Sequence, residues 1–492
     1  MTPQRHSVVV GAGAGGLAMT LLLAKAGRRV TLLEATPRLG GALQRFVRGG
    51  VPFDTGFHFT GGMDGMLRQM LAVLGIDDLV REEPLRNRIY LAETGRMVAV
   101  PAGGMDKVCE ALCTEFPDAA GAIREYCRCE TWIMEHTPLA DLRDRGFWDK
   151  LALNEYDFVS LDQFLNRIGA AGEVRAVLAA AAMCHGSAPS ECPLTHHSRV
   201  SFGLNDHIAR TTRGGDAFLD GFRREAAKLP IEIRTRVTVA ECLEWDGGEC
   251  HRVRLSDGEE LAFDDMFLAI HPRSIAELLP EAARSRGFRA RVDKYRDSCG
   301  FFTVWGVLRD GGNETAELTS FLSCNDLNRM LLPGGGGHGT GIVRARERAA
   351  DGRMVTTLTA FRSVFPEDTL RWSGAACRRD DAGYRAYKQE TAARVIAEIE
   401  TVYPEYRGGV DYLESASMLS FRDYLPPTGC AYGVRRKVGE THLFGRLPVR
   451  NFYALGQSAL VPGVIGTLMS SFLLFRQLVG EERYFATIKG GV

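Results

Sequence analysis

A glycine-rich turn near the amino terminus constrains the fold more than any other stretch of the sequence. Residues 7–10 form a short, mostly β-branched run, and the segment 11–16 (GAGAGG) follows it at once. Residues 17–26 then have the composition of an apolar helix, and residues 29–33 that of a second strand ending at Glu34. A strand, a glycine turn, a helix and a strand with an acid about twenty residues on form a dinucleotide-binding fingerprint. The sequence therefore predicts a Rossmann-like βαβ unit.

Each glycine of this turn has its own mechanical reason. Gly11 permits the tight turn, Gly13 lets backbone N–H groups approach a diphosphate, and Gly16 lets helix and strand pack closely. The helix amino terminus adds partial positive charge, and Glu34 is suited to a ribose 2′-hydroxyl, which disfavours NADP. Residues predicted to bind the dinucleotide here are Gly11, Gly13, Ala14, Gly15, Gly16, Glu34 and Ala35. Residues 334–339 (GGGGHG) fit the same expression without a flanking strand or helix, so we interpret them as a loop.

A second pair of glycines follows Glu34 after a short interval. The stretch 38–42 (RLGGA) resembles the extended signature of FAD proteins with two dinucleotide-binding domains, where the arginine and glycines wrap the same diphosphate. This favours FAD over NAD, and Arg38, Gly40, Gly41 and Ala42 join the predicted cofactor-binding residues. No second complete fingerprint is present, so a built-in NAD(P)H domain is not expected.

Composition narrows the class of protein. The chain has 492 residues and a formal net charge of −1, with 45% hydrophobic and 25% charged residues. At roughly 100–200 residues per domain, this predicts two or three domains or one interleaved pair. The near-neutral balance argues against a nucleic-acid partner. The 12 cysteines follow no zinc-binding spacing, so we expect reduced thiols, a cytoplasmic location and no metal site. The apolar amino terminus is interpreted as structure rather than as a targeting segment.

Later segments indicate that the nucleotide domain is discontinuous. Residues 211–245 read as another piece of it, followed by a β-meander with a tight turn at Asp257-Gly258. Strands are predicted over 299–308 and 353–361, and an amphipathic helix over 384–402. The predicted fold class is α/β, with a Rossmann-like FAD domain interleaved with an α+β substrate domain. We assign 1–105, 205–290 and 440–492 to the FAD domain, and 106–204 and 291–439 to the substrate domain.

Six motifs spread along the chain carry a family resemblance. They are FDTGFHFTGG (53–62), GGDAFLDGF (214–222), VTVAECLEW (237–245), AIHP (269–272), PTGCAYG (427–433) and NFYALGQSALVPGVIGT (451–467). With the amino-terminal fingerprint, they resemble the FAD-dependent phytoene desaturase, carotenoid isomerase and retinol saturase family over nearly the full length. FDTGFHFTGG is more similar to the isomerase and saturase branches. Gln457, where many relatives have an acid, is similar to saturase-like members.

The resemblance implies further cofactor contacts. Val237 would lie beside the adenine, and the segment from Gly456 onward would close over the flavin, with backbone of residues 462–466 near the ring. The cofactor-binding residues implied in this way are Val237, Ala269, Gly456, Gln457, Gly463, Val464 and Ile465.

This assignment bears on the uncharged run 456–475, which is about as long as a bilayer is thick, near 20 residues. Glycines and a proline are poor residues for a lipid-facing surface but suit backbone that lies against a ring. We therefore expect a buried helix rather than a membrane anchor. Its amino terminus near Gly463 would stabilise negative charge on reduced flavin.

Two residues are candidate proton donors. His58 lies between two phenylalanines, and Tyr432 lies in the GCAYG loop. For His58, a histidine with a structural hydrogen bond is the favoured alternative. Residues predicted to line the substrate site are Phe57, Phe59, Phe301, Trp305 and Cys430, for which ordinary core packing is the alternative. His185, His196 and His197 flank a proline-containing loop and are interpreted as surface histidines rather than metal ligands.

The predicted function is that of an FAD-dependent oxidoreductase acting on carbon–carbon double bonds of a long apolar or polyene substrate. Saturation or cis–trans isomerisation is favoured over desaturation, with an external electron donor or acceptor. An amine-oxidase-like flavoenzyme and a flavin-free lipid carrier similar to Rab GDP-dissociation inhibitors are the alternatives. Aromatic residues among the charges of 147–165 leave a peripheral membrane contact open, with ordinary packing favoured.

Overall fold

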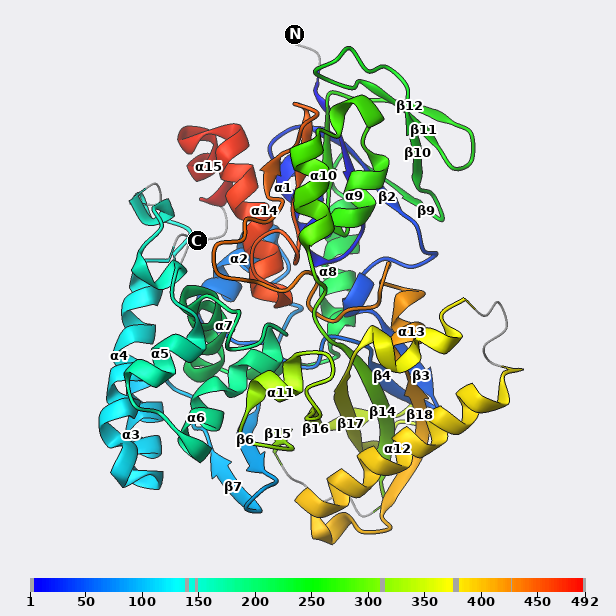
Figure 1. The fold of residues 1–492 in the computed structure, drawn as a ribbon. Coiled ribbons are helices and arrows are strands. Elements are labelled where there is room, and N and C mark those ends of the chain that lie inside the picture. The colour runs from blue at the N-terminus through cyan, green and yellow to red at the C-terminus, as the bar shows by residue number, and fades with distance from the viewer. Residues whose placement is uncertain are drawn as a thin grey trace.

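The computed structural model describes residues 4–137, 141–146, 149–309, 315–374, 380–425 and 427–489. Two large sheets organise these residues, and the chain passes between them several times (Figure 1). The amino-terminal strands and the carboxyl-terminal helices lie together in the upper half of the view, although they are far apart in the sequence.

The first sheet has six strands in the order β19-β20-β13-β1-β2-β9. Five of them run parallel, and the short β19 pairs antiparallel with β20 at the edge. The central strand β1 is buried along its whole length, as expected for a parallel sheet covered on both faces. The strands are β1 (His6–Val10), β2 (Arg29–Glu34), β9 (Ile231–Thr235), β13 (Asp265–Leu268), β19 (Gly445–Arg446) and β20 (Phe452–Ala454).

Helices pack against this sheet and form one hydrophobic core with it. The buried faces of α1 and α14 meet in that core together with α2, α8 and α15. The helices are α1 (Ala14–Lys25), α2 (Met66–Leu74), α8 (Gly215–Ala226), α14 (Gly463–Val479) and α15 (Glu481–Ile488). Helices α9 (Pro272–Leu278) and α10 (Arg286–Lys294) follow β13 and help to build a second core with β1 and β13. The predicted α/β fold is confirmed.

The second sheet has seven strands in the order β18-β14-β17-β16-β15-β6-β7. All neighbours are antiparallel except β15 and β6, which run parallel. The strands are β6 (Arg86–Leu91), β7 (Arg96–Ala99), β14 (Gly300–Leu308), β15 (Glu317–Leu322), β16 (Gly339–Arg348), β17 (Met354–Val364) and β18 (Val410–Ala416). The domain division remains a prediction. Strand pairing nevertheless places residues 86–99 in this sheet, whereas the predicted division gave them to the FAD domain. The sequence did not show this, because β6 pairs with β15, which lies more than 200 residues later in the chain.

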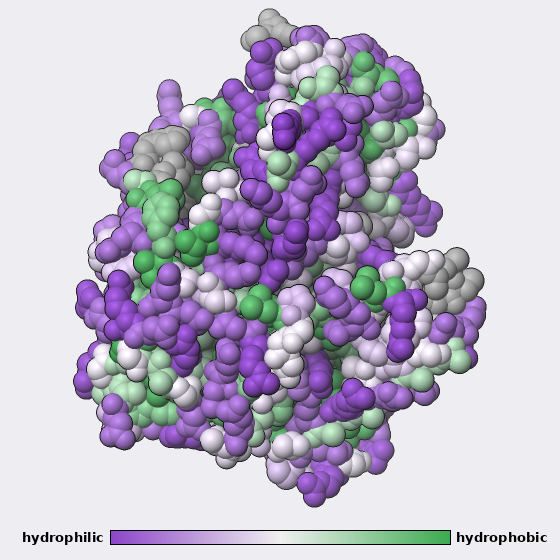
Figure 2. All heavy atoms as spheres, in the orientation of Figure 1, coloured by the Kyte–Doolittle hydropathy of each residue, from purple (hydrophilic) through white to green (hydrophobic). Residues whose placement is uncertain are grey.

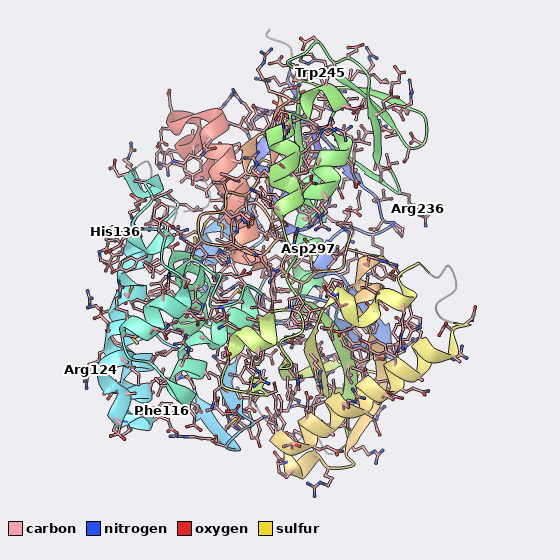
Figure 3. All side chains as sticks on the ribbon, viewed as in Figure 1. Phe116, Arg124, His136, Arg236, Trp245 and Asp297 are labelled. Carbon is pink, nitrogen blue, oxygen red and sulfur yellow. The ribbon has the colours of Figure 1, made fainter. Side chains whose placement is uncertain are left out.

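Two sets of helices pack around the seven-stranded sheet. On the left of Figure 1, helices from α3 to α7 form a layer beside β6, and α12 crosses the lower right. The helices are α3 (Met105–Glu115), α4 (Ala120–Glu135), α5 (Leu161–Arg167), α6 (Gly172–Ala179), α7 (Leu194–Asp206), α11 (Leu327–Leu331), α12 (Ala382–Val402) and α13 (Met418–Arg422). Asp297, labelled near the centre of Figure 3, joins the two halves because His271 and Thr428 both bond to its carboxylate, at 3.0 and 2.8 Å.

Three small sheets complete the structure. They contain β3 (Arg45–Arg48) and β4 (Val51–Asp54), β5 (Glu82–Pro84) and β8 (Ala209–Thr211), and the meander β10 (Val239–Cys242), β11 (Arg252–Leu255) and β12 (Glu260–Ala262). The predicted tight turn joins β11 to β12, with Gly258 at φ +89°.

The uncharged run near the carboxyl terminus forms the buried helix α14, which packs on α1. Within the part of the chain that the structure describes, no helix has the length and apolar character that a bilayer crossing requires.

Candidate FAD and substrate site

The two glycine-rich segments from opposite ends of the sequence are in contact. A Cβ placed on Gly15 would lie 3.0 Å from the Thr467 Cγ2 atom and 3.4 Å from the Gly456 Cα atom. The Ser471 hydroxyl donates to the Gly15 carbonyl at 2.9 Å, and the Gly456 N–H donates to the Ser470 hydroxyl oxygen at 2.9 Å. The first turn of α1 is therefore joined to the middle of α14 by one hydrogen bond, and a second bond fixes Gly456 to the same part of α14.

The glycines of the first turn divide into two kinds. Gly11 has φ +95°, and a Cβ on Gly16 would lie 1.8 Å from the Gly11 carbonyl oxygen, so neither position accepts a side chain. Gly13 differs, because a Cβ there would meet no atom within 4 Å. The loop containing Gly41 faces this open space, since a Cβ on Gly41 would lie 3.4 Å from the Gly13 Cα atom. The two glycine loops thus border one open cradle.

The cradle offers donors for an anion. Helix α1 begins after Gly13 with no side chain capping its first N–H groups. Helix amino termini without an internal acceptor bind phosphate groups well, because the free N–H groups and the helix dipole both favour negative charge.

Glu34 and Val237 lie at the ribose and adenine end. The Glu34 carboxylate accepts the Ala12 N–H and the Thr36 N–H, both at 2.8 Å, and its remaining lone pairs can accept ribose hydroxyls. The Val237 N–H donates to the Glu34 carbonyl at 3.1 Å. Ala35 is exposed.

Other predicted cofactor residues surround the same space or lie at its edges. The Arg38 guanidinium donates to the carbonyl of Arg45, the first residue of β3, at 3.1 Å. Gly40 packs against Leu219, and Ala42 lies against Gly56. Ala269 follows β13 and lies beside Gly11, and its N–H donates to the Val10 carbonyl at 2.8 Å.

The carboxyl-terminal segment provides a second uncapped helix. Pro462 precedes α14 without a side-chain cap, and a Cβ on Gly463 would meet nothing within 4 Å. Val464 and Ile465 are half-buried. Ile465 faces Gly62 and Gly203, with its Cδ1 atom 3.1 and 4.0 Å from their Cβ positions.

Gln457 lies nearby, because its Cγ atom is 3.3 Å from the Cβ position of Gly433 in the Tyr432 loop. The open cradle, the two uncapped helices and the Glu34 carboxylate fit a dinucleotide with an extended head group.

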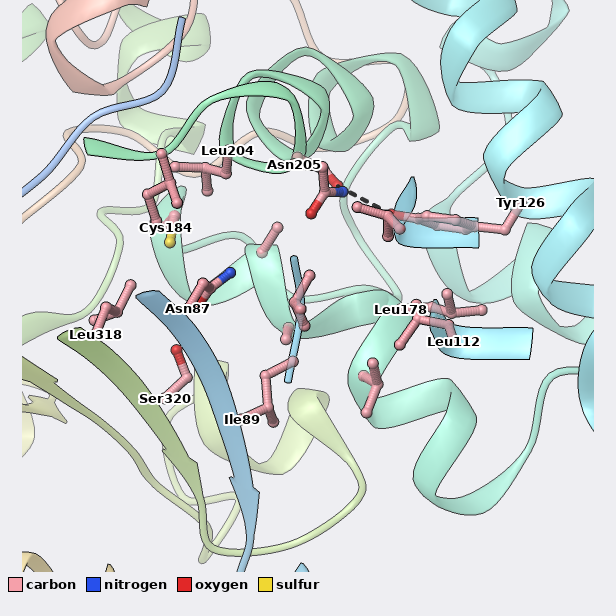
Figure 4. Close-up of a pocket in the computed structure, with 17 residues that line it drawn as sticks. Asn87, Ile89, Leu112, Tyr126, Leu178, Cys184, Leu204, Asn205, Leu318 and Ser320 are labelled. Atoms are coloured by element: carbon pink, nitrogen blue, oxygen red, sulfur yellow. Dashed lines mark hydrogen bonds between the residues drawn. The ribbon is translucent and has the colours of Figure 1, made fainter. Parts of the chain in front are cut away.

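A cavity opens beyond Gly203, on the side of the second sheet (Figure 4). The cavity volume is about 50 Å³, and the cavity opens in part to solvent. Most of its wall is apolar, with polar groups from Tyr126, Ser201 and Asn205 on one side. The other lining residues are Asn87, Ile89, Val100, Val108, Leu112, Val177, Leu178, Ala180, Ala181, Cys184, Leu204, Ile208, Leu318 and Ser320.

The sequence profile of flavin containing amine oxidoreductases matches residues 14–300, more than half of the chain. The chain belongs to the flavin-containing amine oxidoreductase family. All-trans-retinol 13,14-reductase of Macaca fascicularis is 24% identical over 97% of this chain and 86% of that protein. Phytoene desaturase of Neurospora crassa is 26% identical over 65% of this chain and 57% of its own length. The structure of wild-type putrescine oxidase bound to putrescine superposes with a TM-score of 0.61 at 16% identity, covering 97% of this chain and 99% of that one.

These comparisons confirm two predictions made from the motifs. The resemblance to the phytoene desaturase and retinol saturase group is confirmed, and FAD is the cofactor of this member of the flavin-containing family. The individual residues assigned to FAD remain predictions, since the comparisons test none of them singly.

The His58 side chain is buried. Its ring stacks on Phe361 with 4.7 Å between ring centroids. Burial and, secondarily, the nearby Arg210 guanidinium lower the pKa of His58 to about 3. The imidazole is therefore neutral at physiological pH, and the role of His58 as a proton donor stays a prediction.

Tyr432 is half-buried and stands edge-on to Phe301, with 5.8 Å between ring centroids. Burial raises the pKa of Tyr432 well above its usual value. No hydrogen bond of its hydroxyl is found among the described residues. Its donor role stays a prediction.

The predicted substrate residues lie in different environments. Phe59 and Phe301 pack in one cluster with Leu204, Ile208 and Leu318, which line the cavity. They therefore pack beside the cavity wall without lining it.

Three other predicted substrate residues belong to surrounding cores. Phe57 packs edge-on against Phe218 in the core of the six-stranded sheet. Trp305 donates its indole N–H to the Asp54 carbonyl at 2.9 Å. Cys430 is buried, which raises the pKa of its thiol to about 12. Ordinary packing, the alternative stated from the sequence, describes these three contacts.

The interpretation of His185, His196 and His197 as surface residues is wrong. All three are buried: His196 and His197 lie on α7, which packs onto α4, and His185, which precedes α7, lies against the His197 ring. Donor atoms of His185, Cys192 and His196 lie within 4.8 Å of one another, but both ring nitrogens of His185 already have partners, the Ser187 N–H at 3.2 Å and the His197 ring at 3.1 Å. The expectation of no metal site remains a prediction.

The cavity wall is the part of the site that sequence reasoning missed. Tyr126 and Asn205 carry no recognisable motif, and they meet only because α4 and α7 pack together. A glutamate, Glu130, on the buried face of α4 is the one local signal that a polar site lies there.

Proposed function

We propose that this chain is an FAD-dependent oxidoreductase that acts on carbon–carbon double bonds of a long apolar polyene, retinoid- or carotenoid-like. Saturation or cis–trans isomerisation is favoured over desaturation. The observation that carries the proposal is the mostly apolar cavity lined by Leu204, which follows Gly203, the residue that Ile465 of the carboxyl-terminal segment faces. The full-length similarity to an all-trans-retinol 13,14-reductase supports the same substrate class.

Each part of the site has a chemical task in this proposal. Bound FAD supplies hydride exchange with one carbon of the double bond. The uncapped amino terminus of α14 favours negative charge near the ring. The apolar wall, which includes Ile208 and Leu318, binds the hydrocarbon chain and excludes water. A proton donor for the second carbon completes the requirements.

An amine oxidase is the second candidate, favoured by the likeness to putrescine oxidase in fold. A cationic amine is bound by carboxylates or by aromatic faces. No Asp or Glu is found among the cavity's lining residues in the described part of the chain, and Tyr126 is the single aromatic residue among them, so no pair of facing aromatic rings is present there. The geometry therefore favours the polyene. A flavin-free carrier is disfavoured by the intact cradle around Gly13.

Two partners are part of the proposal. An external electron donor or acceptor closes the catalytic cycle. A lipid surface is the source of so apolar a substrate, and Leu153 and Phe158 are 72% and 57% exposed in the chain after α4. Figure 2 shows hydrophobic atoms at the edge of the molecule where this segment runs. Flotation with phospholipid vesicles tests the contact, and replacing both side chains by aspartate should abolish any binding.

The proposed function predicts that the reduced enzyme converts a polyene, with its flavin reoxidised in a saturation and left reduced in an isomerisation. The FAD-loaded protein is reduced anaerobically with dithionite and mixed with all-trans-retinol or a carotenoid, and the flavin spectrum is followed by stopped flow. A product heavier by two hydrogens indicates saturation, and a product of unchanged mass with a shifted retention time indicates isomerisation. Reduction of the oxidised flavin by putrescine, with no reaction of any polyene, would contradict the proposal in favour of the amine oxidase.

A further inference from the structure

A chain of buried hydrogen bonds runs between α4 and α7 behind the polar side of the cavity. The Tyr126 hydroxyl lies 2.7 Å from the Glu130 carboxyl oxygen, 3.0 Å from His197 Nε2 and 3.1 Å from the Ser201 hydroxyl oxygen. His197 Nδ1 in turn lies 3.1 Å from His185 Nε2. Glu130 and His197 are both 0% exposed. The tyrosine hydroxyl is therefore the junction of this chain.

One backbone donor fixes the direction of the chain. The Ser187 N–H donates to His185 Nδ1 at 3.2 Å, so that nitrogen carries no proton in the neutral ring. His185 Nε2–H then donates to His197 Nδ1, and His197 Nε2–H donates to the Tyr126 oxygen. With His197 donating to its oxygen, Tyr126 has its own proton free for Glu130 or for an acceptor in the cavity. The same bond from His197 stabilises the oxygen after that proton leaves.

Glu130 is able to store a proton. Burial raises the pKa of Glu130 to about 8. The titratable groups that face it are Tyr126, Cys127 and Cys129 of its own helix and His197 of α7. Burial lowers the pKa of His197 to about 4, so this ring is neutral and leaves the glutamate uncompensated. Glu130 is therefore protonated at neutral pH, and its proton is shared with the Tyr126 hydroxyl.

Tyr126 also reaches the cavity. It lines the wall together with Ser201 and Asn205, and Figure 4 draws the bond from the Asn205 amide to the Ser201 hydroxyl oxygen, 3.2 Å long, at this place. Among the described lining residues, the titratable ones are Tyr126 and Cys184. Burial raises the pKa of the Cys184 thiol to about 12. Among the described residues, the thiol has no hydrogen-bonded carboxyl group of the kind that Glu130 provides for Tyr126.

We propose that Tyr126 is the proton donor to the substrate and that Glu130 returns the proton to it. The inference rests on the proposed function. In a saturation, the double bond takes a hydride from reduced FAD on one carbon and the Tyr126 proton on the other, so that two new C–H bonds replace the π bond and FAD is oxidised. The Tyr126 oxygen then takes the Glu130 proton, and the Glu130 carboxylate regains a proton from water after the product leaves. Tyr126 is the catalytic residue, and Glu130 and His197 are positioning residues.

The chain offers a matched control for the tyrosine. Tyr403 is also buried, and its hydroxyl donates to a buried carboxylate, that of Glu317, at 2.7 Å. It packs in the core between α12 and the seven-stranded sheet and does not line the cavity. Tyr126→Phe should keep its FAD and lower the polyene-dependent reoxidation rate by about 10²- to 10⁴-fold, the usual contribution of a general acid. Tyr403→Phe should stay within about threefold of the wild type. Equal rates in Tyr126→Phe and the wild type would overturn the inference while leaving the proposed function intact.

An infrared experiment on the resting protein tests the stored proton without any turnover. The difference spectrum between wild type and Glu130→Gln at pH 7 should contain a protonated carboxyl band that disappears with a midpoint near pH 8. Glu130→Gln should also slow reoxidation and flatten its pH profile in this range. Absence of the band overturns the proton store. A wild-type enzyme that neither saturates nor isomerises any polyene, with the band present, would instead refute the proposed function.

Discussion

Gly13→Glu yields a folded protein that has lost its FAD. Gly13 has φ −74° and ψ 178°, a conformation open to any residue, and its Cβ position meets nothing within 4 Å. The new carboxylate therefore fits the unliganded chain but fills the cradle at the amino terminus of α1. It excludes the diphosphate and repels its charge, so we expect at least a hundredfold weaker binding. Flavin absorbance per chain measures the loss, and circular dichroism reports the fold.

Two variants show whether the effect is specific. Gly121→Glu places the same side chain on α4, at an exposed position that also has nothing within 4 Å, and should retain full flavin. Gly16→Ala should instead destabilise the protein, because its Cβ would lie 1.8 Å from a backbone oxygen. A Gly13→Glu protein with normal flavin content would show that the diphosphate lies elsewhere.

The second large effect concerns stability. Arg210→Met should lower the free energy of unfolding by about 3–5 kcal/mol, the usual cost of breaking a buried ion pair on one side. The Arg210 guanidinium is 4% exposed and bonds to Glu83 at 2.9 Å, Asp54 at 3.3 Å and Glu347. Arg45 completes the cluster, 2.8 Å from Asp54 and 2.7 Å from Glu347. Removing one cation leaves buried carboxylates without compensation.

Denaturant unfolding followed by circular dichroism measures the change. Arg128→Met removes an exposed pair with Glu125 and should leave the midpoint unchanged. Adding Glu347→Gln to Arg210→Met should restore part of the loss, because it removes one uncompensated charge. An Arg210→Met protein as stable as the wild type would mean that this cluster does not hold β4, β8 and β16 together.

The sequence was most informative where the physics is local. The strand, glycine turn and helix around Gly11, Gly13 and Gly16 can be recognised because steric limits of adjacent residues dictate them. The tight turn at Gly258 and helix α12 follow from equally short patterns. The burial of helix α14 was predicted from the family resemblance, since its apolar run by itself also suits a bilayer.

What the sequence did not reveal depends on contacts between distant segments. His185, His196 and His197 were placed at the surface, because nothing near them shows that α4 covers α7. Tyr126 was overlooked for the same reason, and its role emerges only from the bonds to Glu130 and His197. The placement of β6 in the second sheet likewise rests on its parallel pairing with β15.

The central claim is that two remote glycine segments close around one FAD. Hydrogen exchange followed by mass spectrometry, on the flavin-free protein with and without added FAD, tests it most directly. FAD should slow amide exchange in peptides covering 11–16 and in those covering 456–466, and leave the distant helix α12 unchanged. Protection of the first segment alone, with exchange in 456–466 unaffected, would contradict the account.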